Sequence, residues 1–528
     1  MNTLNQLYDQ QEYEHWKKQK EKEKIVILDE NGKVLPFNVA QYITQEHYII
    51  TFEDTEEIFI YNEGYYQKGG EKHLHKFLQN LLKDKLSNHI VNEILGHVKR
   101  STYHSRESAT EPKDKICLEN GVLDINTLTV EPHSPNMVFL NRLPFAYNKN
   151  ANCPCIKKFL FEVVREEDLL VLQEFAGYCL WKKYHIQKMF LLIGGGSNGK
   201  STFLSLLRSF LGPENCAAIP LQHMTMDRFS VAHLFGKLVN IFADLSAKAL
   251  NETSILKMLT GDDLIPAQKK FKDGFFFINH AKQIFSCNKV PRSPDDTDAF
   301  FRRWVMINFP YQFLGKKADK DLIKKLTTPE ELSGFFNFAL EGLKRLLENG
   351  DFSLNKAVEE VREQYIRESD SVAAFVMDCI ELQSNGYIPK KKLYTHYADY
   401  CRERNYPAVA ENAFHRELQF KIRVDDYRPA AREGTRDRPP CWKGITIKPE
   451  AINLLIKLGK SLTSLTTLTE NEKNVNHVND VNPFSHLRSK SEKETIQTNN
   501  TSPKLCFRCN LPFEEDSELC YGCNQEKL

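Results

Sequence analysis

The sequence predicts an α/β fold in which buried strands alternate with helices, and three observations support this prediction. The apolar run Leu191 to Ile193 predicts the end of a buried strand, and a glycine-rich loop and an opening helix follow it. The apolar segment LVNIFADLS predicts a second buried strand that leads to Asp244. The segment QIFSC predicts a third, which ends at Asn288.

The length and composition of the chain limit its number of domains and the kinds of partner that it can bind. A chain of 528 residues has room for about three domains. The net charge of +1 gives no overall basic field, so any contact with nucleic acid must come from local patches. The sequence has no apolar run of about 18 residues and no apolar signal core at its N-terminus, so we expect no membrane association and no export.

The first part of the chain mixes helices and strands. Residues 1–90 are predicted to form an N-terminal α+β region, in which short strand-like segments alternate with the helical run HLHKFLQNLLKDKL. Residues 91–185 are predicted to form a mixed α/β domain. In it, Asn120 and Gly121 make a hairpin turn, and an alternating strand runs from Val122 to Val130.

The glycine-rich loop matches the pattern G-x-x-x-x-G-K-[ST]. Backbone N–H groups in such a loop surround phosphate oxygens, and the start of the following helix adds a favourable dipole. Lys200 would reach the β- and γ-phosphates, and the hydroxyl of Ser201 would bind Mg²⁺. The flanking strand and helix argue against an ordinary glycine-rich turn. We therefore predict an ATP site formed by Gly194, Gly195, Gly196, Ser197, Asn198, Gly199, Lys200, Ser201 and Thr202.

Polar residues near the ends of the later strands complete the predicted site. A carboxylate at a strand end beside a phosphate loop binds Mg²⁺, so Asp244 is predicted to act with Ser201, although a strand-end aspartate can also cap a helix. Asn288 can sense the γ-phosphate or orient the attacking water; the alternative is a turn asparagine. Arg302 and Arg303 precede another apolar strand, and a guanidinium there suits a finger that acts on a neighbouring subunit's nucleotide.

Five segments in order carry a family resemblance: GGGSNGKST, ADLS, LKMLTGDDLIPAQKKFK, IFSCN and FFRRWVMINF. Together they resemble the superfamily 3 helicases, in particular the primase–helicase branch of phages, plasmids and large DNA viruses. LENGVLDINT and NKNANCPCIKKFL resemble the segment that precedes the helicase in that branch. The resemblance implies an AAA+-like ATPase core at residues 186–315. Residues 316–370 are predicted to be helical, because ELSGFFNFALEGLKRLLENG is amphipathic.

The resemblance also implies roles for individual residues. The catalytic residues would be Lys200, Asp244, Asn288 and Arg303, with Arg302 as a near-equal candidate for the arginine finger. The pore-hairpin motif of the family falls on Asp263, Ala267 and Lys270.

Near the tip of that hairpin, Lys270 and Phe271 pair a cation with an aromatic ring, the two groups that grip single-stranded DNA. Lys269 and Lys272 flank this pair. The alternative is that Phe271 belongs to the core and the three lysines form a solvated face.

The implied protein is a homo-oligomeric ring, a hexamer, that binds ATP and Mg²⁺ between subunits. Its partners would be single-stranded and forked DNA, with a separate primase or other replisome proteins, in the cytoplasm of a host cell. Two departures from the family pattern matter. Asp244 is followed by Leu245 and Ser246 rather than a second acid, so the general base is not identified. Residues 1–90 are too few for the primase domain of the family and lack its cluster of acidic residues, so we expect no primase activity.

The C-terminal part of the chain predicts two further modules and a linker. Residues 371–450 contain three helical segments and a strand-like pair, which is typical of a winged-helix domain. It would either dock on DNA or pack within an oligomer. Its basic loop carries Arg428, Arg432, Arg436 and Arg438. Residues 451–503 are polar and predict a flexible linker.

A cysteine-rich tail, residues 504–528, ends the sequence. Cys506, Cys509, Cys520 and Cys523 form two C-x₂-C pairs, whose four thiolates suit a structural Zn²⁺ site. Disulfides would need an oxidising compartment, and the scattered distribution of the other cysteines favours a reducing one.

The function that the sequence predicts is therefore an ATP-dependent replicative DNA helicase of a virus, plasmid or integrated element. Two alternatives remain. One is an ATP-dependent DNA-binding switch that acts as an origin-binding scaffold. The other is a complete primase–helicase.

Overall fold

The computed structural model describes residues 25–106, 111–246, 250, 253–270, 272–315, 319–353, 356–404, 406–430, 438–451, 504–505 and 512–513. It divides into two units, Met1–Thr469 and Glu470–Leu528. In the second unit the described residues form a short antiparallel pair, β18 (Lys504–Leu505) and β19 (Pro512–Phe513). Several predicted functional residues lie outside the described residues and stay predictions: Cys506, Cys509, Cys520, Cys523, Phe271, Arg432 and Arg436.

A parallel sheet forms the centre of the first unit. Its strands are β8 (Met189–Ile193), β9 (Cys216–Ala217), β10 (Val239–Phe242), β13 (Lys282–Cys287) and β14 (Trp304–Asn308). The spatial order is β14-β8-β13-β10-β9, and every neighbouring pair is parallel. All residues of β8 and β13 are buried, which explains their continuous apolar runs. The α/β prediction is confirmed.

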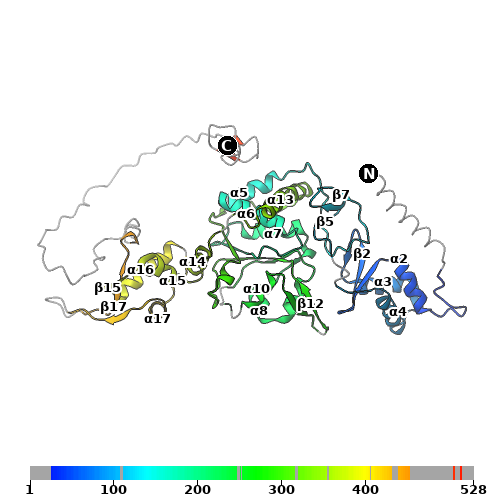
Figure 1. Ribbon diagram of the computed structural model, residues 1–528, viewed down its shortest axis with the longest axis horizontal. Helices are drawn as coiled ribbons and strands as arrows, with labels where there is room; N and C mark the ends of the chain where they lie inside the picture. The colour runs from blue at the N-terminus through cyan, green and yellow to red at the C-terminus, as the bar shows by residue number, and fades with distance from the viewer. Residues whose placement is uncertain are drawn as a thin grey trace. The chain divides into compact units, whose positions relative to one another are not determined.

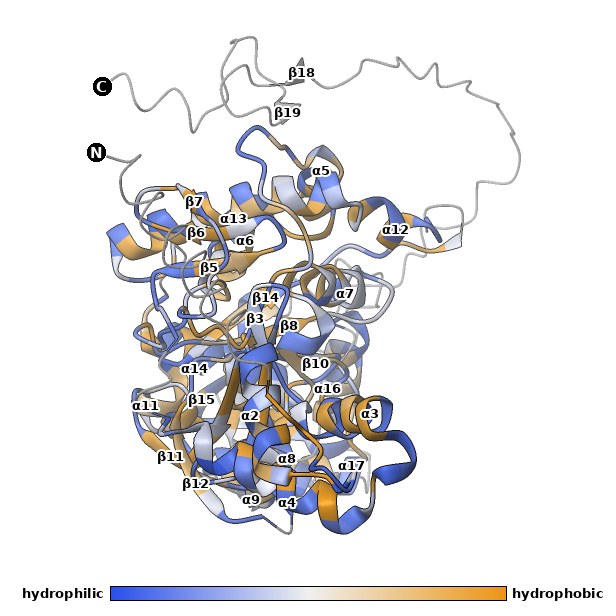
Figure 2. Cartoon of the chain, turned by 90° about the vertical axis from the view of Figure 1, so that its right-hand side faces the viewer, coloured by the Kyte–Doolittle hydropathy of each residue, from blue (hydrophilic) through white to orange (hydrophobic). Residues whose placement is uncertain are grey.

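Helices cover one face of this sheet. Phe190 and Leu192 of β8 point into a hydrophobic cluster beneath these helices, whereas Met189, Leu191 and Ile193 point to the other face. The covering helices are α5 (Pro154–Val163), α6 (Glu166–Tyr178), α7 (Lys200–Leu211), α12 (Leu322–Leu326) and α13 (Pro329–Asn349). Figure 1 shows α5, α6, α7 and α13 together on this side, and Figure 2 shows hydrophilic and hydrophobic residues on both α5 and α13.

Short elements cover the other face. They are α8 (Leu221–Met226), α9 (Arg228–Val231), α10 (Ser254–Leu259), α11 (Asp298–Phe301), the 3₁₀ turn η3 (Ala232–Leu234), and the hairpin β11 (Leu264–Gln268) and β12 (Gly274–Ile278). The 3₁₀ turn η2 (Pro213–Asn215) instead follows α7 and packs against it. The hairpin alternates strictly. Ile265 and Phe277 are buried, whereas Leu264, Phe276 and Ile278 are exposed. The predicted pore-hairpin motif falls on this element.

The N-terminal part of the described chain forms an α+β layer. Its helices are α2 (Pro36–Glu46), α3 (Gly70–Leu82), the 3₁₀ turn η1 (Lys83–Lys85) and α4 (Asn88–Ser101). Its sheet has the order β3-β2-β1-β4, built from β1 (Ile49–Phe52), β2 (Glu57–Asn62), β3 (Tyr65–Gln67) and β4 (Tyr103–His104). The helices and isoleucine side chains of β1 and β2 together form a hydrophobic core that is separate from the clusters of the central sheet.

The predicted hairpin around Asn120 is present with different bounds. Strands β5 (Lys115–Leu118), β6 (Gly121–Asp124) and β7 (Val130–Glu131) form an antiparallel sheet. Gly121 pairs with Leu118, so it opens β6 instead of lying in the turn. The predicted strand Val122 to Val130 is wrong as one element. The Asp124 carboxylate accepts hydrogen bonds from the N–H groups of Asn126 and Thr127, and this turn interrupts it.

The C-terminal part of the first unit contains α14 (Val358–Ser369), α15 (Ser371–Cys379), β15 (Ile380–Pro389), α16 (Lys390–Glu403), α17 (Glu411–Lys421), β16 (Asp425–Tyr427) and β17 (Cys441–Ile447). The sheet order is β15-β17-β16, and both pairs are antiparallel. Strand β15 was not predicted. Its pairing register shifts between Gln383 and Tyr387, so no period of two survives in the sequence. Among the described residues, no helix combines the length and apolar character needed to cross a membrane.

Candidate nucleotide-binding site

The glycine-rich loop joins the carboxyl end of β8 to the first turn of α7. Gly199 has φ +89°, and its Cβ, if present, would lie 2.6 Å from the Cγ1 of Val163 on α5. A Cβ on Gly194 would lie 1.9 Å from the side-chain nitrogen of Asn198. Both positions therefore require glycine, the first for its backbone conformation and both for close approach. The predicted strand–loop–helix arrangement is present.

Lys200 lies inside the loop with its side chain almost fully buried, 6% exposed. Its Nζ donates to the carbonyl oxygen of Gly194 at 2.7 Å and to Oδ1 of Asn198 at 2.9 Å. It also lies 3.4 Å from Oδ1 of Asn288 at the end of β13. Burial lowers the pKa of Lys200, and the nearby Asp244 opposes this shift. The ammonium group is thus held at the point where the loop meets the strand ends.

Asp244 follows β10 in a left-handed conformation, with φ +60°. Its N–H donates to Oγ of Ser286 on β13 at 3.3 Å, and the N–H of Leu245 donates to the Ser286 carbonyl at 2.7 Å. This conformation is uncommon for a residue with a side chain and is seen at functional sites. The exposed Asp244 side chain lines the same cavity as the loop.

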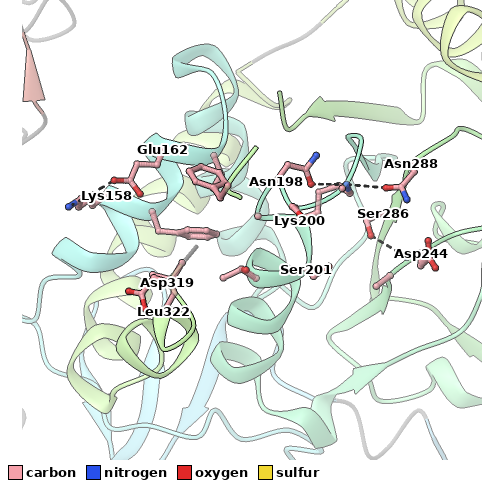
Figure 3. A pocket seen from close by; sticks show the side chains of 18 of the residues that line it. Lys158, Glu162, Asn198, Lys200, Ser201, Asp244, Ser286, Asn288, Asp319 and Leu322 are labelled. Atoms are coloured by element: carbon pink, nitrogen blue, oxygen red, sulfur yellow. Dashed lines mark hydrogen bonds and ion pairs between the residues drawn. The ribbon is translucent and has the colours of Figure 1, made fainter. Parts of the chain in front are cut away.

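One cavity of about 790 Å³ joins these groups (Figure 3). The loop residues Gly196 to Thr202, Asp244, Ser286 and Asn288 line one end. The predicted residues Lys200, Ser201, Asp244 and Asn288 are therefore brought together. Ser286 was not predicted, because a serine within an apolar strand segment carries no local sign of a functional role.

The other end of the cavity has a different character and was not predicted. Phe159 and Val163 of α5, Phe313, and Leu322 of α12 provide apolar surface there. The N–H of Phe313 donates to the Ser197 carbonyl at 2.8 Å, which ties this end to the loop.

Charged residues lie at the rim of this apolar end. They are Lys158 and Glu162 on α5, Asp319 just before α12, and Lys325 on α12. Figure 3 shows Lys158, Glu162, Asp319 and Leu322 on the opposite side of Ser201 from Asp244. No local motif marks these residues, since they come from separate segments of ordinary composition.

Oxygen donors at the polar end fit Mg²⁺. The Ser201 hydroxyl, the Asp244 carboxylate and the Ser286 hydroxyl all line the cavity. Hard cations prefer such ligands, and Mg²⁺ commonly takes one or two carboxylates and completes its shell with phosphates and water. Within the described part of the chain, no three His, Cys, Asp or Glu side chains gather to hold a metal by themselves.

The two arginines lie elsewhere. They precede β14, whereas the cavity lies beyond the carboxyl ends of the strands, roughly 20 Å away along the sheet. Arg303 is buried, 6% exposed. Its guanidinium donates to Thr260 Oγ1 at 2.9 Å, to Gln187 Oε1 at 3.1 Å and to the Ala299 carbonyl. Arg302 is exposed and donates to Gln187 Oε1 at 2.9 Å. The structure thus holds Arg303 inside the subunit and leaves Arg302 at the surface.

The predicted DNA-binding lysines lie at the turn of the β11–β12 hairpin. Lys270 and Lys272 are exposed there. Lys269 is half-buried and forms an ion pair with Glu57 at the start of β2. This contact was not predicted, because 212 residues separate its two partners in the chain.

The chain is similar to three known protein families and to two viral proteins. Residues 5–165 match the family described as D5 N terminal like, residues 367–432 match the Poxvirus D5 protein-like family, and residues 192–303 match a family of unknown function, DUF5906. The chain is 21% identical over 382 residues to "Putative helicase V13" of Sputnik virophage, over 67% of this chain and 48% of that protein. It is 26% identical over 159 residues to "Putative helicase L207/L206" of Acanthamoeba polyphaga mimivirus, over 29% of this chain and 16% of that protein.

The chain therefore spans about half the length of the first of these proteins and about a sixth of the second. Among solved structures, the apo C-terminal region of NrS-1 is similar with a TM-score of 0.39 and 12% identity, over 78% of this chain and 99% of that one. A second structure of that region, in its A form, gives a TM-score of 0.41 and 11% identity, over 80% and 100%.

Proposed function

The chain belongs to the viral primase–helicase family, and on that premise we propose that it is an ATP-dependent helicase that acts on DNA. The observation that supports this proposal most strongly is the convergence of Lys200, Asp244 and Asn288 in one cavity at the edge of a parallel sheet. These groups come from three strand ends, and their chemistry suits a nucleoside triphosphate.

In the proposed site, the loop N–H groups and Lys200 bind the β- and γ-phosphates. Ser201 and Asp244 would hold Mg²⁺, which would neutralise charge on the phosphate oxygens. The Asn288 amide, positioned by its contact with Lys200, orients the attacking water. The apolar end of the cavity receives the nucleobase between Phe159, Phe313 and Leu322, because aromatic and aliphatic faces suit a flat heterocycle.

A neighbouring subunit completes the site. A guanidinium that reaches another subunit's γ-phosphate must be exposed, and Arg302 meets this requirement whereas Arg303 does not. We therefore assign the finger to Arg302 and assign Arg303 to positioning the segment before β14. The copies would form a ring, a homohexamer in the family pattern, with a separate primase.

Two elements would contact DNA. The turn of the β11–β12 hairpin carries Lys269, Lys270 and Lys272, which would follow the backbone of a single strand inside the ring. The order of α15, β15, α16, α17, β16 and β17, with β15 paired to β17, supports a winged-helix domain. Its third helix α17 exposes Asn412, Arg416, Gln419 and Phe420, residues suited to a groove of duplex DNA.

Strand displacement tests the proposal. Wild type, Lys200→Ala and Arg208→Ala are compared on a forked DNA with ATP; Arg208 is an exposed cation on the same helix. We expect DNA-stimulated hydrolysis and displacement from wild type and Arg208→Ala, and at least a 100-fold loss from Lys200→Ala. Hydrolysis without displacement on either tail polarity would favour the DNA-binding switch. Absence of hydrolysis in wild type would contradict the proposal.

A further inference from the structure

The hairpin turn proposed to bind DNA already holds a carboxylate of the same chain. Lys269 donates through Nζ to Oε1 of Glu57, and both side chains are about a quarter exposed, 25% and 28%. Glu57 begins β2 and ends an acidic segment, here called the acidic turn, which consists of Glu53, Asp54, Thr55, Glu56 and Glu57. An acidic segment thus lies against a basic one.

A second contact fixes the acidic turn beside the hairpin. Arg106 donates to both carboxylate oxygens of Asp54, at 2.5 and 3.0 Å. Its guanidinium carbon also lies 4.5 Å from the ring centroid of Phe52, 4.2 Å from that of Phe235 and 4.3 Å from that of Phe275 on β12. This bidentate, stacked arginine joins the turn to the buried face of the hairpin.

The surroundings of Glu57 are cationic. Lys68 lies nearby and donates to the Phe235 carbonyl at 3.2 Å. Burial, then the charges of Lys237 and Lys269, lower the pKa of Lys68 to about 8. The pKa of Glu56 is lowered chiefly by Lys99 and slightly by Lys272 of the hairpin turn. Lys68 and Lys269 therefore lie near Glu57, and Lys99 and Lys272 lie near Glu56, so cations face the acidic turn, an arrangement that favours anionic groups at this position.

The Glu57 carboxylate uses only one of its two oxygen atoms in these contacts. Its Oε2 is buried, and among the described residues it has no hydrogen-bond partner. A partly exposed lysine–carboxylate pair contributes little to stability, whereas a DNA strand presents a row of phosphates. The carboxylate is thus a weak occupant that a polyanion can displace.

We propose that Glu57 occupies the position of a DNA phosphate on Lys269, so that single-stranded DNA must displace the acidic turn before the hairpin can grip it. This inference rests on the proposed helicase function. The alternative is that the pair only attaches the N-terminal layer to the core, in which case its loss would lower stability and leave DNA affinity unchanged.

The test measures binding of a fluorescein-labelled oligo(dT) by anisotropy, with the full chain and a non-hydrolysable ATP analogue. Glu57→Gln removes the competitor's charge. Glu53→Gln is the matched control, since it removes the same charge from an exposed position of the same turn. We expect Glu57→Gln to bind about 3- to 10-fold more tightly than wild type, and Glu53→Gln to change affinity less than about 2-fold. Thermal unfolding of each variant verifies the fold.

Lys269→Gln provides the second arm. If Lys269 contacts a phosphate, its loss should reduce the slope of log affinity against log salt by about 0.7. In the Lys269→Gln background, Glu57→Gln should no longer tighten binding, because the lysine that it competes for is absent.

The outcomes are separable. Equal affinity of Glu57→Gln and wild type, or tightening that persists without Lys269, would overturn the displacement of the turn while leaving the helicase proposal intact. Failure of both wild type and Glu57→Gln to bind DNA at all, in the presence of nucleotide, would overturn both. A lower unfolding temperature for Glu57→Gln with unchanged DNA affinity would assign the pair to attachment only.

Discussion

Lys200 and Asn288 meet at the edge of the central sheet, with Nζ of the lysine 3.4 Å from Oδ1 of the asparagine. The lysine belongs to the phosphate loop after β8, and the asparagine follows β13, the adjacent strand. The contact therefore links the group that would bind phosphate to the group that would orient water.

Replacing Asn288 should separate binding from chemistry. In Asn288→Ala the loop and Lys200 remain, so ATP affinity should change less than about 3-fold, while hydrolysis falls by about 100-fold. Equilibrium binding of a fluorescent ATP analogue and steady-state hydrolysis measure the two effects. Lys289→Ala, at the next residue, serves as the control and should leave both unchanged. Equal losses in binding and hydrolysis would contradict the water-orienting role.

The two arginines before β14 should behave differently. Arg302→Ala should retain the wild-type unfolding temperature and ATP affinity but lose at least 1,000-fold in hydrolysis, because it removes a charge supplied to a neighbour. Arg303→Ala should lower the free energy of unfolding by about 1–3 kcal/mol, since it removes a buried guanidinium that donates to Thr260, Gln187 and the Ala299 carbonyl.

Mixing inactive subunits tests the neighbour's role directly. Lys200→Ala and Arg302→Ala are each inactive alone, yet mixed oligomers contain some interfaces with an intact loop on one side and an intact Arg302 on the other. Partial recovery of hydrolysis on mixing is expected. No recovery, in oligomers shown to exchange subunits, would mean that Arg302 acts within its own chain or not at all.

Gly199→Ala should damage the nucleotide site without a change of charge. The added methyl group would meet Val163 at 2.6 Å, and the residue would keep an unfavourable φ of +89°. We expect at least a 10-fold loss of ATP affinity and a loss of about 1–3 kcal/mol in the free energy of unfolding. Gly195→Ala is the control, because its nearest neighbour is 3.7 Å away. Calorimetric titration with ATP measures both variants.

The apolar end of the cavity can be tested with a ligand that has no base. Phe313→Ala should weaken ATP binding about 10-fold through loss of stacking, while affinity for inorganic tripolyphosphate stays constant. Tyr311→Ala removes an aromatic ring that is 49% exposed and does not line the cavity, so it should affect neither ligand. Parallel losses for ATP and tripolyphosphate would mean that Phe313 supports the loop and not the base.

Lys282 should make stability depend on pH. Its Nζ is buried and donates to the carbonyls of Trp181, Lys183 and His280 at 2.6–2.9 Å. Burial lowers its pKa from 10.5 to about 7. Between these values the unfolded chain binds a proton that the folded chain lacks, so stability rises with pH across this window.

The comparison of Lys282→Met with wild type isolates this effect. The free energy of unfolding of wild type should increase relative to the variant between pH 7 and 9, by at most about 1.4 kcal/mol per pH unit. Denaturant unfolding at several pH values measures it. Lys72→Met, at an exposed site on α3, should follow wild type at every pH. A constant difference between wild type and Lys282→Met would show that the lysine keeps its charge throughout.

Local patterns made the polar end of the site predictable. The loop from Gly194 to Thr202 has fixed spacing, and Asp244 and Asn288 each come at or just after the end of an apolar run, so each was marked by its own neighbours. The apolar end had no such mark. Phe159, Phe313 and Leu322 are ordinary apolar residues in three segments, and only tertiary packing brings them to one cavity.

The exposure of the two arginines and the contacts of the hairpin also depend on tertiary packing, which local sequence does not reveal. Arg302 and Arg303 have the same neighbours in sequence, and their different exposure follows from the turn after α11, which directs Arg303 toward Thr260. The pairing of Lys269 with Glu57 depends on how two distant layers pack. Strand β15 escaped prediction because its irregular pairing removes the alternation by which strands are recognised.

The placement of the nucleotide cavity and Arg302 at opposite ends of one parallel sheet has a consequence for assembly. If Arg302 completes a second chain's site, each copy carries the nucleotide cavity on one side and, on another, the arginine that completes a neighbour's cavity. Such a contact is heterologous, so copies must join head to tail, and a two-fold dimer cannot satisfy it. The rotation per copy then decides between a closed ring and an open filament. A small change at this contact can therefore decide whether the copies close into a ring.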